Sequence, residues 1–132
     1  MSVVDASLLI DVLLGLPAGQ PWRRWVAETN RLAAPDCLGV EVGRYLRRHV
    51  TTGALDGRSA DDALAVMRAL QIELYPTLPL LTDALALRDT FTFDDALYVA
   101  LARRLGEPLA TNDRRLARAA GQAGVTVVAA PT

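Results

Sequence analysis

The sequence contains a single cysteine, Cys37, and this scarcity excludes two kinds of stabilisation. One cysteine cannot form an intramolecular disulfide, and no set of cysteine and histidine residues has the spacing of a zinc site. A disulfide-rich secreted scaffold is therefore excluded, and we expect a protein of the reducing cytoplasm. Aromatic residues are also few, at 5% of the chain, whereas hydrophobic residues make up 52%. The core must be largely aliphatic, and a disordered chain is not expected.

Lysine is absent, because all 14 basic residues are arginine. We interpret this bias as a consequence of a GC-rich genome. It nevertheless excludes phosphate sites that require a lysine, such as the P-loop and the receiver-type phosphoacceptor site. A dinucleotide-binding fold is not expected either, since no Gly-x-Gly-x-x-Gly pattern follows the first expected strand. The net charge of −1 provides no general attraction for nucleic acid, so any RNA contact must come from local arginine clusters.

The N-terminal run MSVVDASLLIDVLL has no basic residues and is interrupted by acids, so it predicts neither a signal peptide nor a membrane span. A chain of 132 residues has the size of one ordinary domain. Such a domain buries roughly two thirds of the surface that its unfolded chain exposes. We therefore expect one domain over residues 1–132, with no membrane association.

Short apolar runs alternate with longer helical patterns along the chain. The expected strands are 2–5, 32–34, 72–75, 109–111 and 125–129. The expected helices are about 7–14, 22–30, 36–52, 57–69, 79–88, 92–105 and 114–120, and the fourth has Ser59 and Asp62 in capping-box spacing. Strands separated by helices form a parallel sheet that is covered on both faces. The predicted fold class is α/β, doubly wound: a three-layer sandwich with a short, mostly parallel central sheet.

Four acidic residues from separate segments are expected at one edge of this sheet. Asp5 ends the first strand, Asp113 follows the fourth strand, and Glu41 lies early in the helix that leaves the second strand. Asp95 opens a helix that must run back to the amino edge, and a helix of that length spans roughly 20 Å, the height of the layer. In parallel α/β sheets the functional site lies at the carboxyl ends of the strands. The topology therefore predicts that these acids meet there.

Carboxylates that meet in this way require a cation. Two of them about 4 Å apart repel by roughly 4 kcal/mol at an effective dielectric constant near 20. An all-oxygen ligand set selects Mg²⁺ or Mn²⁺ over zinc, and such an ion supports phosphodiester hydrolysis. Each acid also has a local explanation. Asp5, Asp95 and Asp113 lie beside helix starts, where capping accounts for each one singly, and Glu41 can be a solvent-facing helix residue.

Asp94 adjoins Asp95 and competes with it for the same role. Consecutive helix residues point about 100° apart, so only one of the pair faces the edge squarely. Asp95 shares a helix face with Tyr98 and Val99, which favours Asp95 as the ligand and makes Asp94 an outer acid. The choice between the two aspartates stays open at this point.

Other polar residues lie close in sequence to the four acids. Ser7, Thr111 and Asn112 can hydrogen-bond the carboxylates or a metal-bound water, although helix capping explains each equally well. Arg44, Arg114 and Arg115 are candidate contacts to RNA phosphates, because guanidinium groups bind phosphate bidentately. The alternative for these arginines is a solvated helix face.

The chain resembles the PIN-domain family, and in particular the VapC-type toxins of bacterial toxin–antitoxin pairs. The resemblance covers nearly the whole chain and rests on the segments VVDAS, APDCLGVEVGRYLRR, FTFDDALYVALARRLGEPLATNDRRLARAA and GVTVV. The spacing of DALYVALA and LATNDRRLA is its most specific part. The family's metal-site acids fall on Asp5, Glu41, Asp95 and Asp113. The sequence departs from the family pattern at Asp94, where similar proteins usually have an aromatic residue.

The resemblance implies an Mg²⁺- or Mn²⁺-dependent endoribonuclease that arrests translation by cutting a structured RNA such as tRNA or rRNA. It further implies a homodimer, and a cognate antitoxin whose tail occupies a groove near the acids, in a heterotetramer or a larger assembly. In the mechanism we expect, Asp5 and Asp95 are the principal ligands, while Glu41 and Asp113 orient water or complete a second metal site. The alternative is a non-catalytic PIN-like module that binds RNA or a protein, and the presence of all four acids argues against it.

Overall fold

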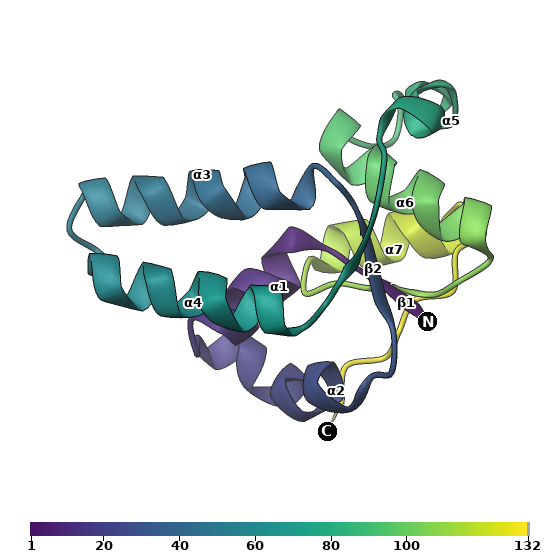
Figure 1. Cartoon of the computed structure of the whole chain (residues 1–132). Coiled ribbons are helices and arrows are strands. Elements are labelled where there is room, and N and C mark those ends of the chain that lie inside the picture. The colour runs from purple at the N-terminus through teal and green to yellow at the C-terminus, as the bar shows by residue number, and fades with distance from the viewer. Residues whose placement is uncertain (132) are drawn as a thin grey trace.

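Four parallel strands form the central sheet of the computed structural model, which describes residues 1–131 (Figure 1). They are β1 (Ser2–Val4), β2 (Leu32–Pro35), β3 (Glu73–Tyr75) and β4 (Leu109–Ala110), in the spatial order β3-β2-β1-β4. Val3 pairs with Ala33 on one side and with Leu109 on the other, so β1 lies inside the sheet. The predicted α/β class with a short parallel sheet is confirmed, and all four carboxyl ends lie at one edge.

Helices connect the strands and cover the sheet. The α-helices are α1 (Ala6–Leu13), α2 (Arg23–Glu28), α3 (Leu38–Thr51), α4 (Gly57–Ala69), α5 (Leu81–Ala86), α6 (Phe93–Leu105) and α7 (Arg114–Gln122), and the 3-10 helices are η1 (Pro17–Trp22) and η2 (Leu78–Leu80). α6 packs against β1 and β2, α5 packs against α6, and α7 packs against β4. Figure 1 shows α3 and α4 side by side as a hairpin that extends away from α5, α6 and α7.

The core is aliphatic, as the composition predicts. Val3, Val4, Ala33 and Ala34 in the two central strands have no exposed surface. α6 is buried on almost every side, since each residue from 96 to 102 is buried. Four of those seven residues are alanine or valine, and such small side chains let the helix lie close to the sheet. Burial of each leucine or valine side chain stabilises the fold by about 1.5–3 kcal/mol.

Three local features differ from the sequence-based expectation. α4 begins at Gly57, as expected, but the capping box predicted at Ser59 is wrong: Asp56 is the N-cap, and its side chain accepts a hydrogen bond from the backbone N–H of Ser59 at 2.7 Å. The predicted last strand is reduced to one bridge between Val127 and Leu109, because β4 has only two residues to pair with. The helices expected at 22–30 and 79–88 are each preceded by a proline-containing 3-10 helix, and their α-helical parts are short.

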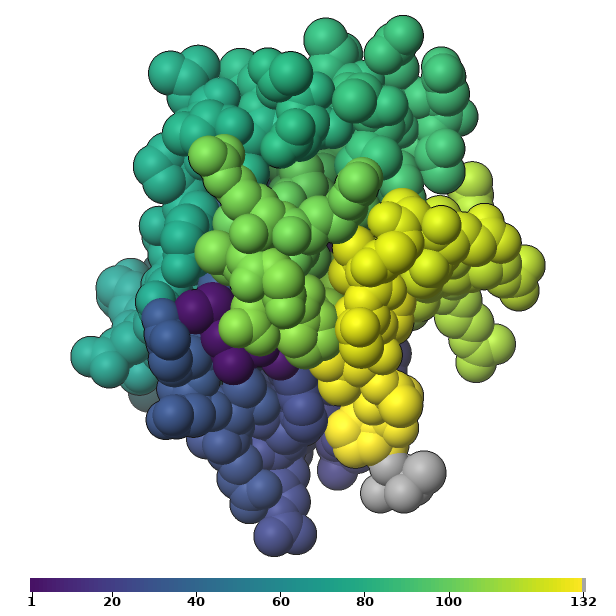
Figure 2. Space-filling model, turned by 90° about the vertical axis from the view of Figure 1, so that its right-hand side faces the viewer, coloured from purple at the N-terminus to yellow at the C-terminus, as the bar shows by residue number. Residues whose placement is uncertain are grey.

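The amino edge of the sheet lies on the face shown in Figure 2, where the N-terminus, the end of α6 and the C-terminal segment come together. The N-terminal amine lies 3.9 Å from a carboxylate oxygen of Glu107, two residues after α6. The carboxyl ends of the strands point away from this face. Within residues 1–131, no helix has the length and apolar character needed to cross a membrane.

Candidate functional site

The four acids expected at the carboxyl edge lie there, each on a different element. Asp5 follows β1 and is the N-cap of α1, while Asp113 follows β4 and is the N-cap of α7. Glu41 lies in the first turn of α3, and Asp95 lies in the first turn of α6. Burial is the largest influence on the pKa of Asp5, Glu41 and Asp95 and raises all three. The charge of Asp95 adds to the rise at Asp5 and Glu41, and the charge of Asp113 adds to the rise at Asp95.

Asp5 is almost completely buried, with 5% of its surface exposed. Its carboxylate accepts hydrogen bonds from Ser7 Oγ at 2.9 Å, from the backbone N–H of Leu8 at 3.0 Å and from Thr111 Oγ1 at 2.5 Å. Burial raises the pKa of Asp5 from 3.8 to about 6, although these hydrogen bonds oppose the rise. The negative charge is therefore incompletely compensated by the protein, and a nearby cation would stabilise it.

Glu41 is half-buried, and the protein holds one of its two carboxylate oxygens. The Tyr98 hydroxyl donates to Oε1 at 2.8 Å, and the Cys37 thiol donates to the same atom at 3.5 Å. Burial raises the pKa of Glu41, the charges of Asp94 and Asp95 add to the rise, and both hydrogen bonds oppose it. Burial also raises the pKa of Cys37 to about 12 and raises the pKa of Tyr98. Both groups therefore remain protonated donors at neutral pH.

Tyr98 and Cys37 are contacts of the candidate site that sequence reasoning missed. Cys37 is typical of a small core residue, and its only signal is its position four residues, about one helical turn, before Glu41. No sequence pattern links Tyr98 to Glu41, because 57 residues separate them. The packing of α6 against β1 and β2 brings the two side chains together.

Asp95 and Asp94 are neighbours on α6 but have different surroundings. Asp95 is half-buried, and burial raises its pKa, with the charges of Asp113 and Asp94 adding to the rise and Arg115 opposing it. Asp94 is exposed, yet its charge reaches Glu41. A hollow of about 220 Å³ is lined by both Asp95 and Asp113 but not by Asp94. The geometry therefore favours Asp95 over Asp94 as the candidate ligand. Asp94 lies close enough to Glu41 for its charge to raise the pKa of Glu41.

Capping also involves three of the acids, as their local explanation predicts. Asp5 accepts from the Leu8 N–H of α1, and the Thr92 hydroxyl accepts from the Asp95 N–H at 3.4 Å. Asp113 Oδ1 accepts from two backbone N–H groups in the first turn of α7, at 2.9 and 3.1 Å. Capping occupies one oxygen of Asp113 and the backbone of Asp95. It is therefore compatible with a second role for these carboxylates.

Thr111 joins two of the acids. Its hydroxyl donates to Asp5 and accepts a hydrogen bond from the backbone N–H of Asp113 at 3.0 Å. Asn112 instead donates to Asp11 at 2.8 Å and to the carbonyl of Ala18 at 3.1 Å. Of the expected supporting residues, Ser7 and Thr111 thus contact Asp5 directly. Asn112 fastens the loop before α7 to α1 and η1.

The acids form an open edge and not a closed cage. Within residues 1–131, no three Asp, Glu, His or Cys side chains lie close enough together to enclose a metal ion. The donor chemistry still suits a hard divalent cation, because all four groups are carboxylates. Mg²⁺ is normally held by one or two protein carboxylates, and water and substrate phosphate fill its other positions. An open edge built around the buried Asp5 fits this mode of binding, whereas a zinc-type cage does not fit.

Hollows on the surface adjoin the acids and contain arginine side chains. One of about 370 Å³ is lined by Glu41 together with Arg44 and Arg48. Arg115 lines the hollow that contains Asp95 and Asp113. Arg114 lines a third hollow, of about 540 Å³, beside Asn112. The expected RNA contacts Arg44 and Arg115 therefore lie next to acids of the edge, and Arg48 lies one helical turn after Arg44.

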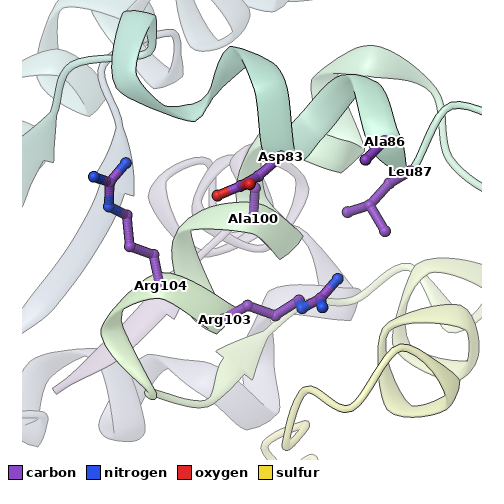
Figure 3. A pocket seen from close by; sticks show the side chains of 6 residues that line it. All are labelled: Asp83, Ala86, Leu87, Ala100, Arg103 and Arg104. Atoms are coloured by element: carbon purple, nitrogen blue, oxygen red, sulfur yellow. The ribbon is translucent and has the colours of Figure 1, made fainter.

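A further hollow, of about 340 Å³, lies between α5 and the last turns of α6, at the far end of α6 from Asp95 (Figure 3). Its charged residues are Asp83, Arg103 and Arg104. The two arginine side chains point in different directions in Figure 3, and Arg104 donates to the carbonyl of Pro79 at 2.8 Å. Because these exposed charges do not converge, the carboxyl edge remains the candidate site.

Comparison with known proteins identifies a family and several relatives that this chain resembles. Residues 2–122 match the family model described as PIN domain. The chain is 41% identical to Ribonuclease VapC1 of Mycobacterium tuberculosis, over 90% of each protein. It is 36% identical to Ribonuclease VapC12 of the same organism, over 92% of this chain and 93% of that protein. It is 33% identical to Ribonuclease VapC3 of Pyrobaculum aerophilum, over 87% of this chain and 91% of that protein.

A solved structure shows the same fold. The crystal structure of PAE2754 from Pyrobaculum aerophilum matches with a TM-score of 0.71 and 24% sequence identity. The match covers 89% of this chain and 78% of that one. At this level of identity the likeness supports the arrangement of strands and helices only.

Proposed function

The chain belongs to the PIN domain family and, within it, groups with the VapC proteins, and from this membership and its acidic edge we propose that it is a metal-dependent endoribonuclease. The observation that carries the proposal is the environment of Asp5. A carboxylate that is 5% exposed and has a pKa of about 6 destabilises the folded protein at neutral pH. The buried charge lowers the free energy of unfolding unless a bound cation compensates it. Strained or destabilised groups of this kind concentrate at functional sites.

We assign Asp5 and Asp95 as the principal ligands of Mg²⁺ or Mn²⁺, with Glu41 and Asp113 orienting water or completing a second site. Ser7 and Thr111 hold the Asp5 carboxylate in place through their hydroxyl groups. The ion, when bound, supplies an activated water and neutralises charge on the phosphate that is attacked. Hydrolysis then leaves 5′-phosphate and 3′-hydroxyl ends.

Arginine side chains beside the acids would bind the RNA backbone. Arg44 and Arg48 share a hollow with Glu41, and Arg115 shares one with Asp95. These positions place guanidinium groups near the acids from more than one side, where they can pair with the phosphates that flank the cut. With a net charge of −1, the protein has no other general attraction for nucleic acid.

Three relatives named above are ribonucleases of the VapC type, and this supports a toxin role for the present chain. We propose that it arrests translation in the cytoplasm by cutting a structured RNA such as tRNA or rRNA. A cognate antitoxin would neutralise it by binding beside the acids, in a heterotetramer or a larger assembly. Growth arrest on expression, with relief by the gene adjacent to it, tests this assignment. Unimpaired growth with soluble, active nuclease in the cells would contradict it.

A homodimer is supported by exposed apolar side chains that are concentrated in one stretch of the sequence. Among the described residues, five of the seven large apolar side chains that are exposed lie between residues 74 and 93: Leu74, Leu78, Leu81, Leu85 and Phe93. Leu78 is 76% exposed. Apolar side chains that lie together on a surface mark contact sites. Light scattering should give the mass of a dimer for the wild type and of a monomer for Leu78→Asp, and an unchanged mass in the variant would remove this support.

The decisive experiment is cleavage of total RNA by purified protein, with Mg²⁺ or with EDTA. Asp5→Asn and Asp95→Asn should reduce cleavage by more than about 100-fold, since loss of a ligand exceeds the typical effect of its supporting groups. Asp94→Asn should retain most activity, and Asp56→Asn, which changes a remote helix cap, is the matched control. Equal cleavage in EDTA and in all variants would refute the metal–acid hypothesis. No cleavage by the wild type would favour the non-catalytic binding module.

A further inference from the structure

The hydrogen bonds around Glu41 assign a role to a tyrosine that lies far from it in the sequence. We propose that Tyr98 is a positioning residue that fixes the orientation of the Glu41 carboxylate, with Cys37 as a weaker second donor. This inference rests on the proposed function, because the orientation of Glu41 has a consequence only if a cation binds at the edge. The donors occupy Oε1 and leave Oε2 for the cation or its water.

The two donors converge on a single atom. Tyr98 donates to Oε1 of Glu41 at 2.8 Å, and Cys37 donates to that same oxygen at 3.5 Å. Within residues 1–131, no protein group donates a hydrogen bond to Oε2. The shorter distance makes Tyr98 the stronger donor, because a thiol is a weak one. The carboxylate therefore has one oxygen held by the protein and one available at the edge.

The donor itself has a fixed place because it belongs to the core. Tyr98 is 1% exposed and lies in the middle of α6, among residues that are all buried. A tyrosine ring in a packed interior has little rotational freedom, so its hydroxyl cannot follow a moving partner. Glu41 is half-buried on the first turn of α3, and its side chain has more rotatable bonds. The rigid phenol thus restricts the more flexible carboxylate.

The protein also holds only one carboxylate oxygen of Asp113, but there the donors are backbone groups. Its Oδ1 accepts the N–H groups of Arg115 and Leu116 at the start of α7, and no donor to its Oδ2 lies within residues 1–131. Glu41 lies in the first turn of α3, but within residues 1–131 no backbone N–H donates to its carboxylate. Side chains supply the hydrogen bonds to Glu41 instead, and the stronger donor comes from another element. Tyr98 fills that position for Glu41.

The competing explanation is structural: a buried hydroxyl needs an acceptor, and Glu41 is the nearest one. The two explanations predict different measurements. If Glu41 only satisfies Tyr98, removal of the hydroxyl changes the stability of the protein and leaves cation affinity unchanged. If Tyr98 positions Glu41, removal of the hydroxyl weakens cation binding, because the free carboxylate loses conformational freedom when the ion binds.

Calorimetric titration of the full chain with Mn²⁺ tests the proposal without any RNA. Tyr98→Phe keeps the ring and removes only the hydroxyl, and it should weaken Mn²⁺ binding by roughly 10-fold. Cys37→Ala should weaken binding less than Tyr98→Phe does. Tyr75→Phe is the matched control, since within residues 1–131 the Tyr75 hydroxyl makes no hydrogen bond, and its affinity should equal that of the wild type.

A double variant tests whether the loss of Mn²⁺ affinity in Tyr98→Phe depends on Glu41. It also distinguishes that dependence from partial unfolding of Tyr98→Phe. In a Glu41→Gln background, Tyr98→Phe should cause no further loss of Mn²⁺ affinity. An equal loss in both backgrounds would overturn the positioning role, because the effect would not pass through Glu41. Equal affinity of wild type and Tyr98→Phe would overturn it as well, while leaving the metal site intact. Absence of any Mn²⁺ binding by the wild type would overturn both this role and the proposed function.

Discussion

Replacement of Asp5 with asparagine should stabilise the metal-free protein, although it removes the central group of the candidate site. Asparagine has nearly the shape of aspartate and is an equally good N-cap, so α1 keeps its start. The substitution removes a buried charge whose pKa rises from 3.8 to about 6, almost entirely by burial against opposing hydrogen bonds. That rise corresponds to about 3 kcal/mol of free energy of unfolding lost at neutral pH. We expect Asp5→Asn to recover only part of it, because the amide nitrogen cannot accept a hydrogen bond such as the one that Thr111 donates to Oδ2 of Asp5.

The raised pKa of Asp5 also determines how the stability of the metal-free protein changes with pH. An acid with a raised pKa in the folded state binds its proton more tightly there than in the unfolded chain. The destabilising effect of Asp5 on the metal-free wild type is therefore absent below about pH 4 and grows as the pH rises from about 4 to about 6. Between pH 5 and pH 7 the loss from Asp5 alone is about 1 kcal/mol. Glu41 and Asp95 have raised pKa values and contribute in the same direction.

Urea unfolding at pH 5 and pH 7, in EDTA and in Mn²⁺, measures these effects. In EDTA at pH 7 the variant should be more stable than the wild type, and its stability should depend less on pH. Mn²⁺ at about 100 times its dissociation constant should stabilise the wild type by about 2.7 kcal/mol and the variant much less. Added metal therefore removes most of the stability advantage that the variant has in EDTA.

Asp56→Asn is the matched control for this experiment. Asp56 is also an N-cap, but it is exposed, and its hydrogen bonds to Ser59 lower its pKa. Its substitution should not stabilise the protein and should leave the response to Mn²⁺ unchanged. The reasoning about Asp5 is refuted if Asp5→Asn is the less stable protein in EDTA at pH 7, or if Mn²⁺ stabilises it as much as it stabilises the wild type.

Three further predictions concern the surroundings of the acids. Thr111→Val removes the hydroxyl between two of the acids and should lower the free energy of unfolding by about 1–3 kcal/mol, measured in urea, since it leaves a buried partner unpaired. Gly19→Ala would place its Cβ 2.3 Å from a backbone oxygen of α1, and should destabilise η1 by about 1–3 kcal/mol in the same assay. Arg44→Gln with Arg48→Gln should weaken RNA binding and reduce its salt dependence, as measured by fluorescence anisotropy, whereas Arg58→Gln on α4 should not.

Much of the candidate site was predictable because its residues lie at element boundaries. The sequence places Asp5 after a strand, and Asp95 and Asp113 beside helix starts, and parallel topology then sends all three to one edge. Hydrophobic periodicity sufficed for this step, since it identifies strands and helices without any knowledge of their contacts. Where the local signals were weaker, the prediction failed. Ser59 lies close to a helix start, but Asp56 is the actual cap.

The sequence by itself determined the alternation of strands and helices, and with it the edge along which the acids lie, because these depend on local patterns and on the handedness of parallel connections. The tertiary structure alone decided the burial of Asp5, the bridge through Thr111 to Asp113, and the contact of Tyr98 with Glu41. Hydrogen bonds between distant segments depend on how α6 and β4 pack beside β1. That packing comes from the shape of the whole core, which no local pattern in the chain encodes.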